Sequence, residues 1–246
     1  METHPAQFRD ALERIEIKGA KRQRAIDAHT EIRACLETDP QLCEWGVHTV
    51  LIGSYARDTG IHPGKDVDVF AKLTKLDISA DPKRVYDTVY RVLADKYGSR
   101  AERQPRSIKV LFDTDGFAVD VVPAVRMDQR WGIPVRNSAE WSNPDQHKRW
   151  VETDPEALAS LATAMNATRT VNGQGAYKPI VKLVRQIRKH HHGAQKPGGL
   201  YFELLTYWAF KTNSVNGDPF AQLLAETLRA IDRQLSSGMP LIDPVL

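Results

Sequence analysis

The sequence has little of what marks zinc-binding, secreted or membrane-spanning proteins. Its 246 residues include two cysteines, Cys35 and Cys43, and no second Cys/His pair stands at the spacing of a zinc site. The N-terminus is polar and charged, and no run of about 18 apolar residues occurs, which argues against a signal peptide and a membrane span. We therefore expect a reduced, cytoplasmic protein with no membrane partner.

The sequence also has little excess of either sign of charge. The formal net charge is +3, with 26% charged and 41% hydrophobic residues. This mildly basic balance suits a protein that handles phosphates but falls short of one that coats nucleic acid. The length allows one large core or two modest ones, and the sequence holds no internal repeat and no low-complexity tract.

The first half of the chain carries the patterns of strands mixed with helices. Apolar residues at helical intervals predict one long or broken helix from Pro5 to Leu36, interrupted at Gly19. A helix over 82–97 begins at a proline and stops before Gly98. The expected strands cover residues 48–52, 66–72, 108–112 and 117–122, and a hairpin turn joins the last two.

The second half of the chain has a helical pattern. Residues 123–155 lack periodicity and predict an ordered connection between two halves, with Trp131, Trp141 and Trp150 packed between those halves rather than stacked on nucleobases. Helices are expected over residues 156–167, 177–191, 200–212 and 218–236. We accordingly predict two domains, 1–150 and 151–246.

Three aspartates are the strongest sign of chemistry. Asp66 and Asp68 share one face of a strand whose other face carries valines, about 6.6 Å apart at roughly 3.3 Å per residue. Asp120, in a later strand, can be brought opposite them. Carboxylates in this arrangement suit two Mg²⁺ or Mn²⁺ ions serving phosphoryl or nucleotidyl transfer. The alternative is a solvated strand face that carries ordinary surface acids.

A Gly-Ser turn follows the first expected strand. Gly53 permits close approach of a phosphate, and Ser54 adds a hydroxyl at the expected start of a short helix, where backbone N–H groups favour anions. The pair precedes Asp66 by a spacer of Tyr55 to Lys65. Taken alone, such a turn is commonly structural.

Basic residues recur on one face of the helix over 177–191. Lys178, Lys182, Arg185 and Lys189 either form a solvated charged face or include a site in which Lys182, with Lys178, neutralises a triphosphate. A further set on the loop after the Gly-Ser turn either contacts substrate or forms surface ion pairs. That set is Arg57, Asp58, His62 and Lys65.

These motifs together resemble a known family. The string GSYARDTGIHPGKDVDVF from Gly53, with VDVVPA further on, is similar to the signature of the polymerase-beta-like nucleotidyltransferase superfamily. Within it, the chain resembles the bacterial cGAS/DncV-like nucleotidyltransferases (CD-NTases), often called SMODS proteins, and their oligoadenylate-synthase-like relatives. The resemblance covers roughly residues 45–245, including WSNPDQHKRWVETDP and YKPIVKLVRQIRK.

The resemblance implies an α+β fold, in which a mixed sheet with flanking helices is followed by a helical substrate-binding region. Residues 1–150 would form the nucleotidyltransferase catalytic domain with an N-terminal helix, and 151–246 a helical nucleotide-binding domain. The chain ends at IDPVL, where this group commonly continues into further helices. It also has Gly199, Leu200 and Tyr201 where the group often has a serine-tyrosine pair.

The resemblance also implies an activity. Gly53 and Ser54 would bind the donor triphosphate, Asp66, Asp68 and Asp120 would hold two Mg²⁺ ions, and the nucleobase would stack on Tyr201. Such enzymes release pyrophosphate while they make cyclic or linear oligonucleotides from NTPs, ATP among them, for antiphage signalling. An activator protein or nucleic acid is a further candidate partner.

Two other functions stay open. A nucleotidyltransferase with the same chemistry modifies tRNA or protein, as toxin-type enzymes do, although the modest charge argues against a large RNA footprint. The other alternative is a catalytically silent sensor, which binds a nucleotide without converting it to product. Labelled macromolecules would favour the first alternative, and nucleotide binding without product would favour the second.

Overall fold

The computed structural model describes residues 4–64, 66–113, 115–212 and 220–246. The chain divides into two compact units. The sheet unit consists of Lys18–Tyr55 and Gly64–Pro155 together with Leu246, and the helical unit consists of Met1–Ile17, Ala56–Pro63 and Glu156–Val245. The architecture is α+β, as the sequence predicted, and no described helix has the length and apolar character to cross a membrane.

The sheet unit contains most of the expected elements. Its helices are α2 (Ala20–Glu37), α3 (Pro40–Glu44) and α5 (Pro82–Tyr97), with short 3₁₀ turns at Gly98–Arg100, Ser138–Ser142 and Gln146–Arg149. Its strands are β1 (Val47–Ile52), β2 (Asp66–Asp77), β3 (Ala101–Arg103), β4 (Ile108–Leu111), β5 (Ala118–Met127), β6 (Arg130–Pro134) and β7 (Trp150–Thr153). The short helix α4 (Gly53–Ala56) follows β1 directly. The helix over 82–97 and the hairpin strands confirm the sequence pattern.

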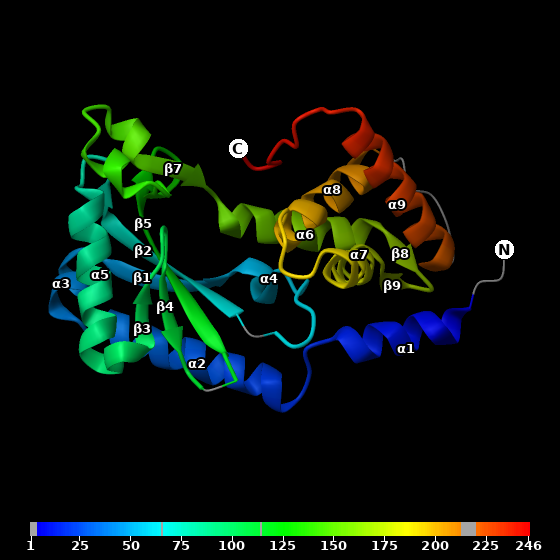
Figure 1. Cartoon of the computed structure of the whole chain (residues 1–246), viewed down its shortest axis with the longest axis horizontal. Helices are drawn as coiled ribbons and strands as arrows, with labels where there is room; N and C mark the ends of the chain where they lie inside the picture. The colour runs from blue at the N-terminus through cyan, green and yellow to red at the C-terminus, as the bar shows by residue number, and fades with distance from the viewer. Residues whose placement is uncertain (1–3, 65, 114, 213–219) are drawn as a thin grey trace. The chain divides into compact units, whose positions relative to one another are not determined.

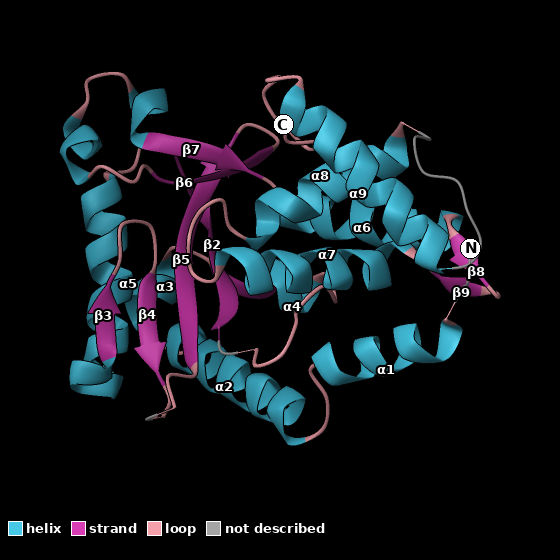
Figure 2. Cartoon of the chain, turned by 45° about the vertical axis from the view of Figure 1, so that its right-hand side comes forward, coloured by secondary structure: helices cyan, strands magenta, loops and turns pink. Residues whose placement is uncertain are grey.

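The described strands of this unit form one mixed sheet, in the order β1-β2-β5-β4-β3, with β6 pairing β5 and β7 pairing β6 (Figure 2). Only the β2–β5 pair is parallel among the pairings described; the others are antiparallel. β2 and β5 therefore start side by side at the same end of the sheet. This places residues near the start of both strands next to one another.

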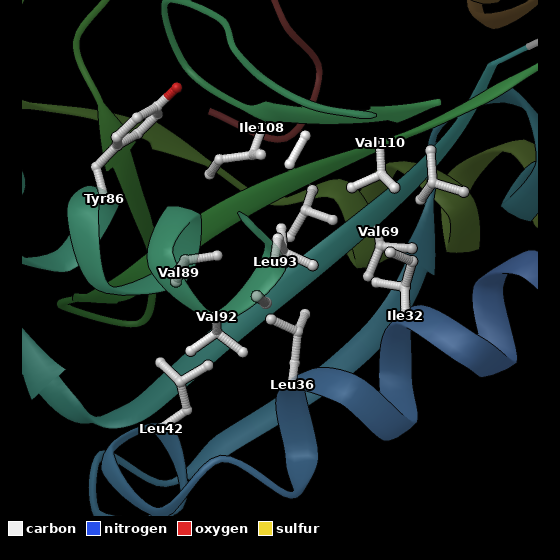
Figure 3. Close-up of a cluster of buried hydrophobic side chains, with 14 of the residues drawn as sticks. Ile32, Leu36, Leu42, Val69, Tyr86, Val89, Val92, Leu93, Ile108 and Val110 are labelled. Atoms are coloured by element: carbon white, nitrogen blue, oxygen red, sulfur yellow. The ribbon is translucent and has the colours of Figure 1, made fainter. Parts of the chain in front are cut away.

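One face of the sheet is sealed by two helices. Val67 and Val69 of β2 and Val121 of β5 point to this face, because strand residues at alternate positions share a face. All three are fully buried under the helices. Figure 3 shows Ile32 of α2 and Leu93 of α5 within this cluster. Full burial of a side chain of this size contributes roughly 1.5 to 3 kcal/mol. This apolar face fixes which side of β2 its aspartates occupy.

Residues 123–155 correct the sequence prediction, because they contain regular structure. β5 continues to Met127, and β6 and β7 extend the sheet. Pro123 is tolerated within β5 because the strand changes partner there: β4 pairs residues 118–121 and β6 pairs residues 125–127. The N–H that proline lacks is therefore not needed on that edge. Short strands with Gly132 and Pro134 give no period that the sequence alone could show.

The tryptophans of this segment find partners inside the sheet unit. Trp131 stacks edge-on against Phe70 with ring centroids 6.1 Å apart, and the indole N–H of Trp150 donates to the Ile78 carbonyl at 3.1 Å. Both tryptophans are buried. The sequence analysis expected these tryptophans to pack between the two halves of the chain, and that is wrong for Trp131 and Trp150, because the partners named here belong to the sheet unit.

The helical unit has its own core. Its elements are α1 (Pro5–Ile15), α6 (Pro155–Thr168), β8 (Thr170–Val171), β9 (Gln174–Gly175), α7 (Tyr177–His192), α8 (Gly199–Lys211) and α9 (Phe220–Ser236). α7 packs against α8 and α9, as Figure 1 shows. The helix expected over 218–236 is described from Phe220 onward, and residues 218 and 219 lie outside the described residues.

The N-terminal helix belongs to the helical unit. The sequence grouped residues 1–150 together, whereas in the structure residues 1–17 and 56–63 cluster with the later helices. Ile15 is buried in the core of the helical unit, and Phe8 and Leu12 pack against that core. The break predicted at Gly19 is confirmed: Gly19, with φ of 55°, lies just before α2, so the predicted segment forms the two helices α1 and α2.

Candidate functional site

Three carboxylates lie on the sheet face opposite the buried valines. Asp68 of β2 is the direct parallel partner of Asp120 of β5, and Asp66 lies two residues before Asp68 on the same face. The side chain of Asp66 is 62% exposed, whereas Asp68 and Asp120 are half-buried. The structure thus brings together the three aspartates that the sequence singled out.

Asp120 has an unusual environment. Its Oδ1 atom is buried and accepts no hydrogen bond from the described residues. Burial raises the pKa of Asp120 to about 6, and the nearby Asp66 charge adds to this rise, whereas Lys109 opposes it. An unsatisfied buried carboxylate oxygen is unfavourable unless a cation or a proton satisfies it.

Lys109 is a site residue that the sequence analysis missed. It pairs with Asp120 across the antiparallel β4–β5 ladder, and its Nζ lies 3.8 Å from Oδ1 of Asp66. A lysine between fully buried Ile108 and Val110 shows the strand alternation, so the pattern could have assigned its face. Which strand it would face required the sheet order.

Gly53 is required by its close approach to Asp68. It has a φ of 69°, and a Cβ added there would lie 1.9 Å from Oδ2 of Asp68. Ser54 follows in α4, at the end of β1, whose Ile52 pairs with Asp68. The Tyr55 hydroxyl donates to the Gly64 carbonyl at 2.8 Å, which holds together the two ends of the loop that separates the Gly-Ser turn from β2.

The chemistry of this group suits a hard cation. Carboxylate oxygens are the ligands that Mg²⁺ and Mn²⁺ prefer, and the orphaned Oδ1 of Asp120 lacks a partner that a cation would supply. The described residues hold no group of three His, Cys, Asp or Glu side chains already gathered around one metal position. The residue types and the unsatisfied oxygen fit a metal, while the side-chain positions are not those of a formed metal cage.

Comparison with known proteins assigns this arrangement to a family. The family described as the Second Messenger Oligonucleotide or Dinucleotide Synthetase domain, SMODS, matches residues 1–154, which include all three aspartates and the Gly-Ser turn. The chain belongs to the SMODS family. The resemblance inferred from the sequence motifs is thereby confirmed.

This SMODS chain is similar in sequence to a known synthase. It is 30% identical over 238 residues to a cyclic AMP-AMP-AMP synthase from an Acinetobacter strain, covering 92% of this chain and 64% of that protein. It therefore spans less than two thirds of the length of that relative.

Solved structures share the fold. The CD-NTase CdnG of Bradyrhizobium diazoefficiens, in complex with GTP, has a TM-score of 0.73 at 17% identity, covering 97% of this chain and 80% of its own. The CdnE cyclic dinucleotide synthase of Elizabethkingia meningoseptica, with GTP and Apcpp, has a TM-score of 0.69 at 19% identity, covering 96% and 86%.

The remaining predicted nucleotide-binding residues of this SMODS chain lie in the helical unit. Lys182 is only 6% exposed, and its Nζ lies 3.2 Å from Asp58 and 3.4 Å from Glu16. A solvated face is therefore wrong for Lys182, because ion pairs inside its own unit already engage it. Lys178 and Tyr201 are half-buried, and the Tyr201 ring packs edge-on against Phe202 at 5.9 Å.

The loop after the Gly-Ser turn is held by a buried charge cluster. Nε of Arg57 donates to Glu203 at 2.7 Å, Thr59 donates to the same carboxylate at 3.1 Å, and both charged side chains are almost fully buried. The alternative of a surface ion pair is wrong for Arg57. Lys65, the last residue of that predicted set, lies outside the described residues.

Proposed function

We propose that this SMODS chain is a metal-dependent nucleotidyltransferase that joins NTPs into cyclic or linear oligonucleotides and releases pyrophosphate. The observation that carries the proposal is the pairing of Asp68 with Asp120, beside Asp66 and the Gly53 turn. Like-charged groups so close together are unfavourable unless a cation compensates them. By analogy with the cyclic AMP-AMP-AMP synthase that it resembles, ATP is the first substrate to test.

Each residue of the site has a proposed role. Asp66, Asp68 and Asp120 would hold two Mg²⁺ or Mn²⁺ ions; nucleotidyltransferases of this family are metal-dependent. The metal, when bound, supplies charge neutralisation and activation of the attacking hydroxyl.

The protein groups supply binding and proton transfer. The backbone N–H groups and hydroxyl at Ser54 bind the donor phosphates, and the absence of a side chain at Gly53 leaves room for them. Asp120 would help to hold the metal that activates the acceptor 2′- or 3′-hydroxyl and would assist the deprotonation of that hydroxyl. Lys109 compensates Asp66 before nucleotide binds.

Partners and setting follow from the same proposal. Lys178, Lys182 and Tyr201 remain proposed contacts of the nucleotide, to be tested by the effect of their alanine variants on the nucleotide KM. An antiphage signalling role, and an activator protein or nucleic acid that switches synthesis on, complete the proposal.

The test incubates the purified protein with each α-labelled NTP, singly and together, with Mg²⁺ or Mn²⁺. Products are resolved after phosphatase treatment. The D66A/D68A double variant is the inactive comparison, and D77A is the matched control, because Asp77 is an exposed carboxylate at the far end of the same strand.

Phosphatase-resistant small products that require Asp66 and Asp68, but not Asp77, support the proposal and identify the bases. Equal activity of the double variant overturns the assigned site. Label found in tRNA or protein instead of small products replaces the oligonucleotide synthase with a macromolecule-modifying enzyme. Nucleotide binding without any product points to a missing activator or to a sensor that never catalyses.

A further inference from the structure

A cavity lies within the sheet unit, lined in part by residues of α5, and Asp66, Asp68 and Asp120 are not among its lining residues. Its volume is about 860 Å³, within the range of pockets that hold small organic ligands. The first turns of α5, the β3–β4 turn and the β6–β7 connection line it. α5 packs on the valine face of the sheet, so this cavity is separate from the carboxylate site.

The cavity carries two arginines from one end of the β6–β7 pair. The Val135 N–H donates to the Arg149 carbonyl at 3.0 Å, continuing the ladder beyond the Pro134–Trp150 pair. Arg136 follows immediately, so the chain emerging at this end of the ladder carries both Arg136 and Arg149 into the lining of the same cavity.

The other charged side chains of the lining already have polar partners. Asp87 pairs with Lys83 at 2.5 Å and with Arg103 at 2.6 Å, and Asp81 accepts the N–H of Lys83 as the N-cap of α5. Arg149 donates through Nε to a backbone carbonyl, and no ion pair to either Arg136 or Arg149 is found among the described residues. The lining therefore presents two guanidinium charges without a carboxylate partner.

An aromatic wall stands beside these charges. The Trp141 ring lies 5.3 Å from the Tyr86 ring, and its N–H donates to the Val135 carbonyl at 2.9 Å. Tyr86 is nearly fully buried, and its hydroxyl contacts the Gln104 carbonyl at 2.7 Å. These contacts fix both rings before any ligand arrives, which lowers the entropic penalty of binding.

We propose that this cavity binds a compact organic anion with a planar ring, of the chemical class of a nucleoside monophosphate. Arg136 and Arg149 hold the anionic group, since guanidinium groups match phosphate and carboxylate geometry. Trp141 packs against the ring. The site is independent of the catalytic proposal, because it uses none of Asp66, Asp68 and Asp120.

The test is calorimetric titration of the whole protein in EDTA with AMP, adenosine and ribose 5-phosphate, at concentrations up to about 1 mM. AMP is expected to bind at one site and more tightly than either fragment, since adenosine lacks the phosphate and ribose 5-phosphate lacks the planar base. The R136A/R149A variant should weaken AMP binding at least tenfold, as expected for loss of charge-assisted hydrogen bonds.

Two controls and one further test variant locate the binding. R106A, at an exposed arginine that does not line the cavity, should leave AMP affinity unchanged, and so should D66A/D68A. R136E, a charge reversal at an exposed position, should weaken binding even if the double variant does not fold. Circular dichroism checks the fold of each.

Three outcomes overturn the proposal. The first is no saturable AMP binding. The second is AMP affinity unchanged in both R136E and R136A/R149A, and the third is binding lost in D66A/D68A alone. If ribose 5-phosphate binds as tightly as AMP, the role given to Trp141 is wrong.

Discussion

Near the start of β2 and β5, the two faces of the central sheet come from the same strands and have opposite chemistry. Val67 and Val69 of β2 are fully buried under α2 and α5, while Asp66 and Asp68 between and beside them face the other way. Adjacent strand residues point to opposite faces, so a single residue step separates core from candidate site. The comparison teaches that one face can be rigid and apolar so that the other can hold like charges close together.

The largest contrast is expected between neighbours Asp68 and Val69. D68N should reduce turnover on the order of a thousandfold or more, as loss of a charge-stabilising group does in phosphoryl transfer, with little loss of stability. V69A should lose roughly 1 to 3 kcal/mol of unfolding free energy but keep activity while folded. Urea denaturation and initial rates measure both. Equal loss of activity in the two folded variants would contradict a division by face.

The next effect concerns the difference in stability between truncating a buried and an exposed side chain of the helices on the apolar face. Leu93 of α5 is fully buried, so L93A should lower the free energy of unfolding by about 2 to 5 kcal/mol. I26A on α2 is the matched control, since Ile26 is 48% exposed and its truncation should change stability by less than about 0.5 kcal/mol. Similar losses in both variants would mean that the helices are not held by this face.

Comparing alanine variants at two glycines distinguishes the effect of backbone strain from the effect of a clash with the site. Gly53 and Gly98 both have positive φ, so alanine at either should reduce stability by about 1 to 3 kcal/mol. A Cβ at Gly98 meets nothing within 4 Å, whereas at Gly53 it meets the Asp68 carboxylate. Only G53A should therefore lose nucleotide turnover. Turnover and thermal melts of both variants test this, and an active G53A would remove the turn from the site.

The smallest effect is a gain in stability in D120N without metal. Burial raises the pKa of Asp120 to about 6 from an ordinary 3.8, so the folded protein binds this proton more tightly than the unfolded chain. The resulting stability is fully present below about pH 4 and is lost as the pH rises through about 6. D120N, uncharged throughout, should be more stable than the unmodified protein at pH 7 by roughly 1 to 2 kcal/mol, with no difference near pH 4.

Thermal melts in EDTA at both pH values measure this difference. D77N is the control of opposite sign, since the Ser79 hydroxyl and N–H hold the pKa of Asp77 below its ordinary value. D77N should therefore gain no stability at pH 7. If D120N gains none either, the orphaned carboxylate is not strained in the metal-free protein.

Much of the fold and site followed from local patterns. The helix Pro82–Tyr97 begins and ends as its proline and Gly98 predicted, and period-two alternation placed Asp66 and Asp68 on one face of β2. The strand β6 was not predictable, since Gly132 and Pro134 interrupt it, and neither was the four-residue β7; both are short segments that only their partners stabilise.

The sequence by itself determined the residue types of the candidate site, because turn chemistry and strand alternation are local properties that neighbours along the chain decide. Only the tertiary structure decided that Asp120 pairs with Asp68, that Lys109 reaches Asp66 and that Lys182 is buried beside Asp58. These contacts join residues far apart in the chain. Sheet order and helix packing bring them together, and it is that packing that sets the burial and hence the pKa of Asp120.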